Sequence, residues 1–354
     1  MMRYTISTAL ASLIALPAFA EVPRVVTDIP PVHALVAQVM GDLGTPELLL
    51  AKGADEHDFA LKPSQMGAIS DAGLVVWIGP ELTPWLDRAL ESSKAQRLGL
   101  LAAAGTYRQD FGAATHDHEV AEEAGHDHDA HDHEEHAAEE HDHDHGAEGG
   151  EHDHDHAAEG GEHDHDHAAE GADHDHDEHG HSHTGLDPHA WLDPGNGRLW
   201  LGLIAAELGR LDPEHAATYT ANAEAAATRL AALDAEVAAG LAPLAEQPFI
   251  TFHDAYGYLA GHYGLEYAGA VALGDASSPG AAHLTELKDR IAAGGITCLF
   301  PEAQHDPALM TQIAGDARIG GVLDPVGSTL EPGPGAYEAL LRSLTGTLAD
   351  CLKG

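Results

Sequence analysis

The sequence has few positive charges, few aromatic residues and only two cysteines in 354 residues. Its 16 lysines and arginines face 59 aspartates and glutamates, which gives a formal net charge of −43 at pH 7. Because proteins bind nucleic acids through clustered lysine and arginine, this balance argues against nucleic acid as a partner. A strongly acidic chain is instead compatible with cations as partners.

The N-terminus lacks an apolar run long enough to span a membrane comfortably. Residues 1–20 read MMRYTISTALASLIALPAFA, with one positive charge at Arg3 and a short apolar stretch broken by Pro17. Ala-Phe-Ala at residues 18–20 fits the small-x-small pattern at which secretory signal peptides are cleaved. We therefore expect a cleaved signal peptide over 1–20, a mature protein that begins near Glu21, and a location outside the cytoplasm, which the family resemblance described below narrows to the periplasm.

The two cysteines, Cys298 and Cys351, are too few for a zinc site made of thiolates alone. Outside the cytoplasm they lie in an oxidising compartment, where a structural disulfide is their expected use. Closing a loop of about 50 residues in this way contributes about 4 kcal/mol to stability in the chain-entropy model.

One segment supplies most of the negative charge. Between His116 and His183 there are 26 acidic residues and 21 histidines, with no lysine or arginine. The unit EHDHDHAAEGG at 151–161 is repeated almost unchanged at 162–172, and its glycines argue against a helical repeat. Residues 112–184 contain no aromatic residue and one valine, so they cannot bury enough surface to offset the entropy of ordering. The composition predicts a disordered loop.

The rest of the chain alternates short apolar runs with helix-like runs. Residues 74–78, LVVWI, are continuously apolar, which indicates a strand covered on both faces. Such alternation predicts an α/β protein with parallel-type sheets flanked by helices. The expected strands are 25–27, 47–50, 74–78, 249–252 and 296–300, and the expected helices are 32–40, 64–72, 254–263, 283–293 and 335–352.

A long alanine-rich run over 212–244 has no glycine before Gly240 and predicts a single long helix. About 28 helical residues span roughly 40 Å, which is longer than one small lobe needs. We therefore expect two α/β lobes joined by one long rigid helix over 212–244. The N-terminal lobe takes residues 21–211, with the disordered loop 112–184 inserted in it, and the C-terminal lobe takes residues 245–354.

Three of the eight histidines outside the loop lie at or near predicted strand ends. His57 lies in GADEHDFALKPSQ, His189 in LDPHAWLDP, and His253 follows the strand FITF and opens the next predicted helix. Ligands of α/β sheets bind outside the carboxyl ends of strands, and zinc accepts three histidines plus a fourth oxygen ligand. These three imidazoles can therefore converge on one metal between the lobes. The spacing alone is a weak signal, and the other five histidines, at 33, 215, 262, 283 and 305, fit ordinary polar positions.

Several segments resemble, in order, those of the zinc- and manganese-binding solute-binding proteins of ABC transporters. They are GADEHDFALKPSQ, LVVWIGPEL, LDPHAWLDP, FHDAYGYLA, ITCLFPEAQ and the ending that starts with LDPVGSTLEPG. The resemblance covers nearly the whole mature chain, and the His/Asp-rich insertion is itself a mark of the zinc members. It implies two α/β lobes with a metal buried between them.

The resemblance also implies which residues bind the metal. Carried over position by position, the ligands are His57, His189 and His253, and Glu56 completes the site, sometimes in competition with water. Asp324 in LDPVG matches the position that supplies an aspartate ligand in several relatives, so the fourth ligand stays open between Glu56 and Asp324. Cys298 and Cys351 match the disulfide pair of the family.

The implied function is binding of Zn²⁺ and its delivery to an inner-membrane ABC permease by a monomer, with periplasmic zinc chaperones as further partners and no enzymatic activity. Three imidazoles with one carboxylate favour zinc, while manganese prefers carboxylate-rich sites. The histidine-rich loop is expected to collect zinc through its His-x-His pairs and pass it to the interlobe site. The alternatives are a manganese-binding relative, a zinc buffer in which only the loop matters, and a zinc hydrolase with Glu56 as base.

Overall fold

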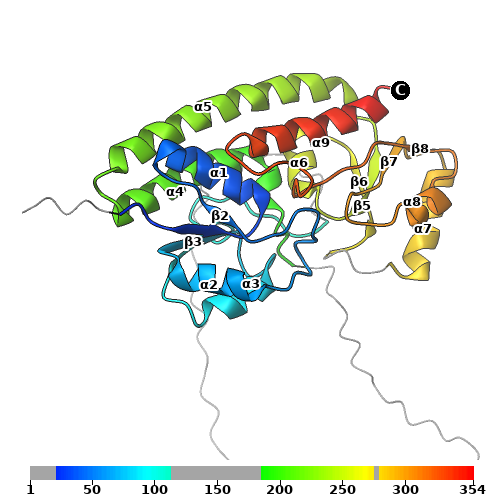
Figure 1. Ribbon diagram of the computed structural model, residues 1–354. Helices are drawn as coiled ribbons and strands as arrows, with labels where there is room; N and C mark the ends of the chain where they lie inside the picture. Colours follow the sequence, from blue (N-terminus) through cyan, green and yellow to red (C-terminus); the bar gives the residue numbers. More distant parts are fainter. Residues whose placement is uncertain (1–20, 113–184, 275–278) are drawn as a thin grey trace, which may run out of the picture. The chain divides into compact units, whose positions relative to one another are not determined.

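The computed structural model describes residues 21–112, 185–274 and 279–354 (Figure 1). The predicted signal peptide over 1–20 lies outside the described residues. So does the predicted disordered loop 112–184, except for its first residue, Gly112. All the described residues belong to the first of the two units into which contacts divide the chain, 1–116 together with 181–354. Both sheets and all the helices named below belong to the first unit.

The first sheet has four parallel strands in the order β2-β1-β3-β4. The side chains of β1 and β3 alternate between two hydrophobic clusters, one on each face of the sheet. Val75 and Trp77, for example, pack with α2 and α3, whereas Leu74 and Val76 face α1 and the central core. The prediction that 74–78 is covered on both faces is confirmed. The elements of this part are β1 (Val25–Thr27), α1 (Pro30–Met40), β2 (Glu47–Leu48), α2 (Pro63–Asp71), β3 (Leu74–Trp77), α3 (Pro84–Leu90) and β4 (Gln96–Gly99).

The second sheet repeats this plan with four parallel strands in the order β6-β5-β7-β8. Phe249 and Phe300 face the central core, while Ile250 and Leu299 pack in a separate cluster with α7 and α8. The two lobes with parallel sheets flanked by helices are therefore as predicted. The elements here are β5 (Phe249–His253), α6 (Gly257–Tyr263), β6 (Tyr267–Ala272), α7 (Ala281–Ala292), β7 (Cys298–Phe300), α8 (Ala308–Ile313) and β8 (Arg318–Ile319).

The long helix α5 (Ala216–Leu241) joins the two lobes and continues into a 3₁₀ turn, Ala242–Leu244. Its buried side chains recur at every third or fourth position, from Tyr219 to Leu241, which is the pattern of a helix with one face in a core. It packs against α1, α4 (Pro194–Leu211) and α9 (Ala336–Leu352), and Figure 1 shows α9 lying alongside it. The predicted long helix is confirmed. None of the described helices is both long and apolar enough to cross a membrane.

The last helix, α9, follows the second sheet in sequence but packs on α1 and α5. Its end is tied back to the second sheet by a disulfide between Cys298 in β7 and Cys351, whose Cα atoms lie 6.3 Å apart. The predicted disulfide is confirmed. Because the same hydrophobic core includes side chains from both sheets and from α1, α5 and α9, the two lobes share one continuous interior.

Two predictions about local structure were wrong. The helix expected over 254–263 begins only at Gly257, and His253 is the last residue of β5 instead of the start of that helix. The reason is a tight turn, in which the Ala255 N–H donates to the carbonyl of His253 at 3.0 Å before the helix begins. The elements α3, β4, β6, α8 and β8, which are short, and the glycine-containing helix α4 were not predicted.

The two flanks of the histidine-rich segment lie side by side. Asp110 and Leu186 form an antiparallel bridge, and the Phe111 N–H donates to the carbonyl of Gly185 at 2.9 Å. The chain therefore leaves and re-enters the first unit at one place. A short linker in place of 117–180 would close this gap without displacing either sheet.

Candidate metal centre

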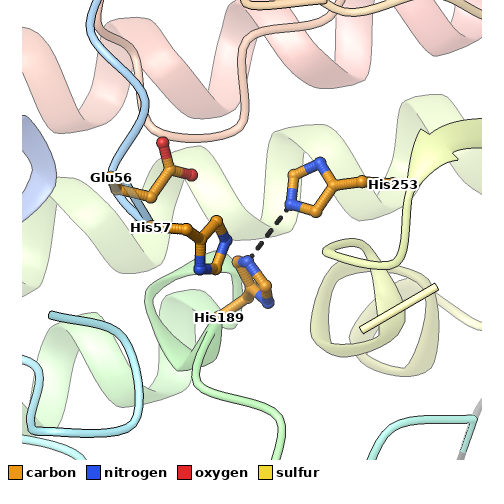
Figure 2. A group of neighbouring side chains, drawn as sticks. All are labelled: Glu56, His57, His189 and His253. Atoms are coloured by element: carbon orange, nitrogen blue, oxygen red, sulfur yellow. Dashed lines mark hydrogen bonds between the residues drawn. The ribbon is translucent and has the colours of Figure 1, made fainter. Parts of the chain in front are cut away.

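Glu56, His57, His189 and His253 come together from three separate segments (Figure 2). Glu56 and His57 lie in the loop after β2, His189 precedes the 3₁₀ turn Ala190–Leu192, and His253 ends β5. Each offers one ligand atom, and these four atoms all lie within 4.8 Å of one another. The structure thus places all four residues that the sequence singled out in one cluster between the lobes.

The three imidazole rings face one another closely. Their centroids are 5.4 Å apart for His57 and His189, 5.8 Å for His57 and His253, and 5.1 Å for His189 and His253. The Nε2 atoms of His189 and His253 are separated by only 3.3 Å. His189 and His253 are buried, and so is the neighbouring Glu56, at 3% exposure.

Two carboxylates hold the outer nitrogens of these rings. His189 Nδ1 lies 2.7 Å from Asp187 Oδ1, and His253 Nδ1 lies 2.6 Å from Glu302 Oε2. Because a carboxylate accepts, each Nδ1 donates a proton and each Nε2 faces the centre of the cluster. Carboxylate–histidine pairs of this kind fix the tautomer and orientation of metal-binding histidines.

His57 is held through the backbone of its loop. The His57 N–H donates to Asp55 Oδ1 at 2.8 Å, and Trp85 Nε1 donates to the carbonyl of Glu56 at 2.9 Å. The Nε2 atom of His57 is buried and has no hydrogen-bond partner among the described residues. A buried nitrogen without a partner is costly unless it binds something, so this atom fits a metal ligand.

Burial shapes the electrostatics of the cluster. Burial lowers the pKa of His57 and of His189 well below the usual range, and the neighbouring imidazoles lower both further. Burial raises the pKa of Glu56 to about 8, although the charge of His253 opposes this. For His253, burial alone would lower the pKa, but the Glu302 carboxylate outweighs it and raises the value to about 9. At neutral pH two imidazoles are therefore neutral and ready to coordinate, and a divalent cation would replace the protons held by Glu56 and His253.

Asp324, the alternative fourth ligand, is engaged elsewhere. Its Oδ1 accepts from the N–H of Ser328 at 3.1 Å and from Gln304 Nε2 at 2.9 Å, and its Oδ2 accepts from the N–H of Thr329 at 2.8 Å. The Asp324 carboxylate thus closes a turn and is absent from the four-residue cluster, where Glu56 supplies the oxygen. Three nitrogens and one oxygen form a donor set that zinc accepts in tetrahedral geometry.

Sequence reasoning missed Asp187, Glu302 and His305. Asp187 stands two residues before His189, and Glu302 follows β7 at the carboxyl end of the strand next to β5. Both positions were detectable, because carboxylates beside histidine ligands or at neighbouring strand ends are the expected outer partners of a metal site. The other four histidines have protein partners: the carbonyl of Pro46 for His33, Asp212 for His215, Asp193 and Asp234 for His262, and the carbonyl of Ala270 for His283.

Comparison with known proteins identifies the family of the chain. Residues 25–351 match the family described as ZnuA, zinc-uptake complex component A periplasmic. The high-affinity zinc uptake system protein ZnuA of Paracoccus denitrificans (strain Pd 1222) is 49% identical over 342 residues, which cover 96% of this chain and 94% of the relative.

Two solved structures share the fold. A crystal structure of ZnuA superposes with a TM-score of 0.65 at 21% identity and covers 93% of this chain and 98% of its own. The solute-binding protein FpvC of Pseudomonas aeruginosa in complex with Mn²⁺ gives a TM-score of 0.65 at 20% identity, with the same coverage. Because the family match spans nearly all of the described chain, the chain belongs to the family of periplasmic zinc-uptake complex component A, ZnuA.

Proposed function

We propose that this protein is a periplasmic solute-binding protein that captures Zn²⁺ between its two lobes and delivers it to an inner-membrane ABC permease. The observation that carries the proposal is the convergence of Glu56, His57, His189 and His253, whose ligand atoms lie within 4.8 Å of one another. Membership of the family supports the same conclusion. In this proposal the ion is the cargo, and residues 1–20 direct the chain to the periplasm and are removed.

The donor set favours zinc as the cargo. Imidazole nitrogen suits zinc, whereas manganese is better held by carboxylate and carbonyl oxygens. The cluster offers one carboxylate against three imidazoles, and Asp324, which would add a second carboxylate, is bound to its own turn. Copper and nickel also suit imidazole, so discrimination against them depends on supply and geometry.

The geometry favours transport over hydrolysis. A catalytic zinc site keeps an open coordination position for water or substrate, whereas a closed site uses four protein ligands. Here Glu56 lies within ligand reach of the same centre as the three histidines and is itself buried. As a fourth ligand it would fill the position that a hydrolase needs to keep open.

The histidine-rich segment is proposed to collect zinc for this centre. Its N-terminal flank ends beside the site, because the Phe111 ring lies 6.2 Å from the His189 ring and Asp110 pairs with Leu186. Because the segment is tethered to the chain that carries the site, ions bound by the segment would raise the local zinc concentration available to the buried ligands.

The test is a zinc titration in competition with a chromophoric chelator. It compares the whole chain, a chain in which a short linker replaces 117–180, and that shortened chain with His57→Ala. We expect the shortened chain to keep one tight site and His57→Ala to weaken it sharply. His215→Ala, which removes an imidazole that is paired with Asp212 and is not a member of the cluster, is the matched control.

Loss of all tight binding in the shortened chain would overturn the proposal, because the segment alone would then be the functional part, as in a zinc buffer. The role of the segment is tested separately by growth under severe zinc limitation. Equal uptake by cells with the whole and the shortened chain would refute collection by the segment and leave the interlobe site as the sole carrier.

A further inference from the structure

A second cluster of ligand-capable side chains adjoins the first. The ligand atoms of His253, Glu302 and His305 lie within 4.8 Å of one another. Glu302 Oε2 is 2.6 Å from His253 Nδ1 and 3.8 Å from His305 Nε2. The two clusters therefore share His253, which presents Nε2 to the buried centre and Nδ1 to Glu302.

The His305 ring is held in place by packing. It stacks on Phe252, with ring centroids 4.3 Å apart and an interplanar angle of 15°. Its backbone N–H donates to the carbonyl of Glu302 at 3.4 Å. The stack leaves the edge of the ring free, and its Nε2 lies 3.8 Å from Glu302 Oε2.

The second cluster leads from solvent to the centre. The side chain of His305 is 19% exposed, whereas those of Glu302 and His253 are 0% and 3% exposed. An ion that binds first at His305 and Glu302 would already be next to the ring that it must reach. The buried centre offers such an ion three imidazoles and a carboxylate, so the move inward is favourable.

We propose that His305, Glu302 and His253 form a second, outer position for a divalent cation, through which the ion enters and leaves the buried centre. The inference rests on the proposed function, because it takes the buried centre to be the binding site. A neutral imidazole has one lone pair, so His253 serves one position at a time. In the outer position Nδ1 binds the ion after releasing its proton to solvent, and Nε2 keeps its own proton. When the ion moves inward, Nε2 releases its proton to solvent and binds the ion, and Nδ1 takes a proton from solvent and again faces Glu302.

The first test isolates the outer position. In the chain with a linker in place of 117–180, His57→Ala with His189→Ala removes two ligands of the buried centre and leaves His253, Glu302 and His305. Titration with Co²⁺, followed by visible absorption, should show one weak site that further replacement of His305 by alanine removes. His283→Ala, whose imidazole contacts the carbonyl of Ala270 in the same lobe, is the control and should leave the site intact.

The second test measures rates with the buried centre complete. His305→Ala should slow both the uptake of zinc and its removal by excess chelator several-fold in stopped-flow experiments, whereas His283→Ala should change neither rate. Unchanged rates in His305→Ala, or no weak site in the first test, would overturn the inference. Zinc affinity of the parent chain is measured as well, because it tests the proposed function separately from the outer position. Absence of tight zinc binding by the parent would refute the proposed function itself.

Discussion

His189 and His253 are 64 residues apart in the chain, yet their Nε2 atoms lie 3.3 Å from each other. Each ring is turned this way because its Nδ1 is held by a carboxylate, Asp187 in one case and Glu302 in the other. At neutral pH the charged His253 ring donates from its Nε2 to the lone pair of His189 Nε2. A cation that replaces this proton finds both nitrogens already facing it.

Asp187 should matter for affinity although it does not reach the metal. Its Oδ1 accepts from both the N–H and the Nδ1 of His189, and its Oδ2 accepts from Gln109 Nε2. Asp187→Ala frees the ring to rotate and makes its Nε2 less basic, so zinc affinity should fall by about 10- to 100-fold. Competition titration of the shortened chain measures this change.

The control for Asp187 is Asp71→Ala, which removes an exposed carboxylate paired with Arg24. It should bind zinc like the parent. An Asp187→Ala protein that is folded and binds with the parent affinity would show that the carboxylate does not position the ring.

Glu56 and Asp324 should respond differently to loss of charge. Glu56→Gln replaces a carboxylate in the cluster by a weaker, neutral ligand, so zinc affinity should fall by about tenfold or more, since one charged ligand is lost. Asp324→Asn alters a carboxylate that accepts hydrogen bonds from Thr329, so its main effect should be on the stability of that turn.

The measurement for this pair is zinc affinity by competition together with the free energy of unfolding in urea for each variant. The assignment of Glu56 as the fourth ligand fails if Asp324→Asn weakens zinc binding more than Glu56→Gln does.

His262 should make stability depend on pH. Its Nδ1 lies 3.0 Å from Asp193 and its Nε2 lies 2.8 Å from Asp234, so both nitrogens donate only when the ring is charged. Burial alone would lower the pKa of His262, but the two carboxylates outweigh it and raise the pKa above 6.5. In the unfolded chain these carboxylates no longer lie next to the ring, so the pKa of His262 returns to its ordinary value. The stabilisation is therefore fully present below pH 6.5 and is lost as pH rises through the folded-state pKa.

His262→Gln should therefore reduce the free energy of unfolding by about 1 kcal/mol at low pH, a modest value because the ring is partly exposed. Urea unfolding at about pH 6 and pH 9 compares the variant with the parent, and the difference should shrink at the higher pH. A difference that stays constant or grows would show that the imidazolium is not the stabilising form.

The disulfide between Cys298 and Cys351 should stabilise the protein by fixing the end of α9. It closes a loop with a sequence separation of 53, which corresponds to about 4 kcal/mol in the chain-entropy model. The double variant Cys298→Ala with Cys351→Ala should unfold at a lower urea concentration than the parent. Adding reductant should lower the urea midpoint of the parent toward that of the variant and leave the midpoint of the variant unchanged. A midpoint of the parent that stays the same after the disulfide is shown to be reduced would contradict the entropic account.

How far the fold could be predicted from sequence is clearest in two helices. The buried face of α5 repeats every third or fourth residue and the helix is rich in alanine, so the sequence predicted it. Helix α4 was missed because its first turn contains glycines. A Cβ on Gly197 would lie only 2.5 Å from the Tyr337 hydroxyl of α9, so close packing between distant segments requires the residue that weakens the helical signal.

The sequence by itself determined the chemistry that is available to this protein. It supplied three imidazoles and a carboxylate, two cysteines in a chain with a signal-like N-terminus, and an acidic, histidine-rich insertion. Only the tertiary structure decided which donors meet. Glu56 joins the histidines while Asp324 closes a turn, Asp187 and Glu302 aim the rings, and His305 stands beside His253. These choices depend on where strands and loops end in space, and that is set by packing between segments far apart in the chain, which local residue patterns do not encode.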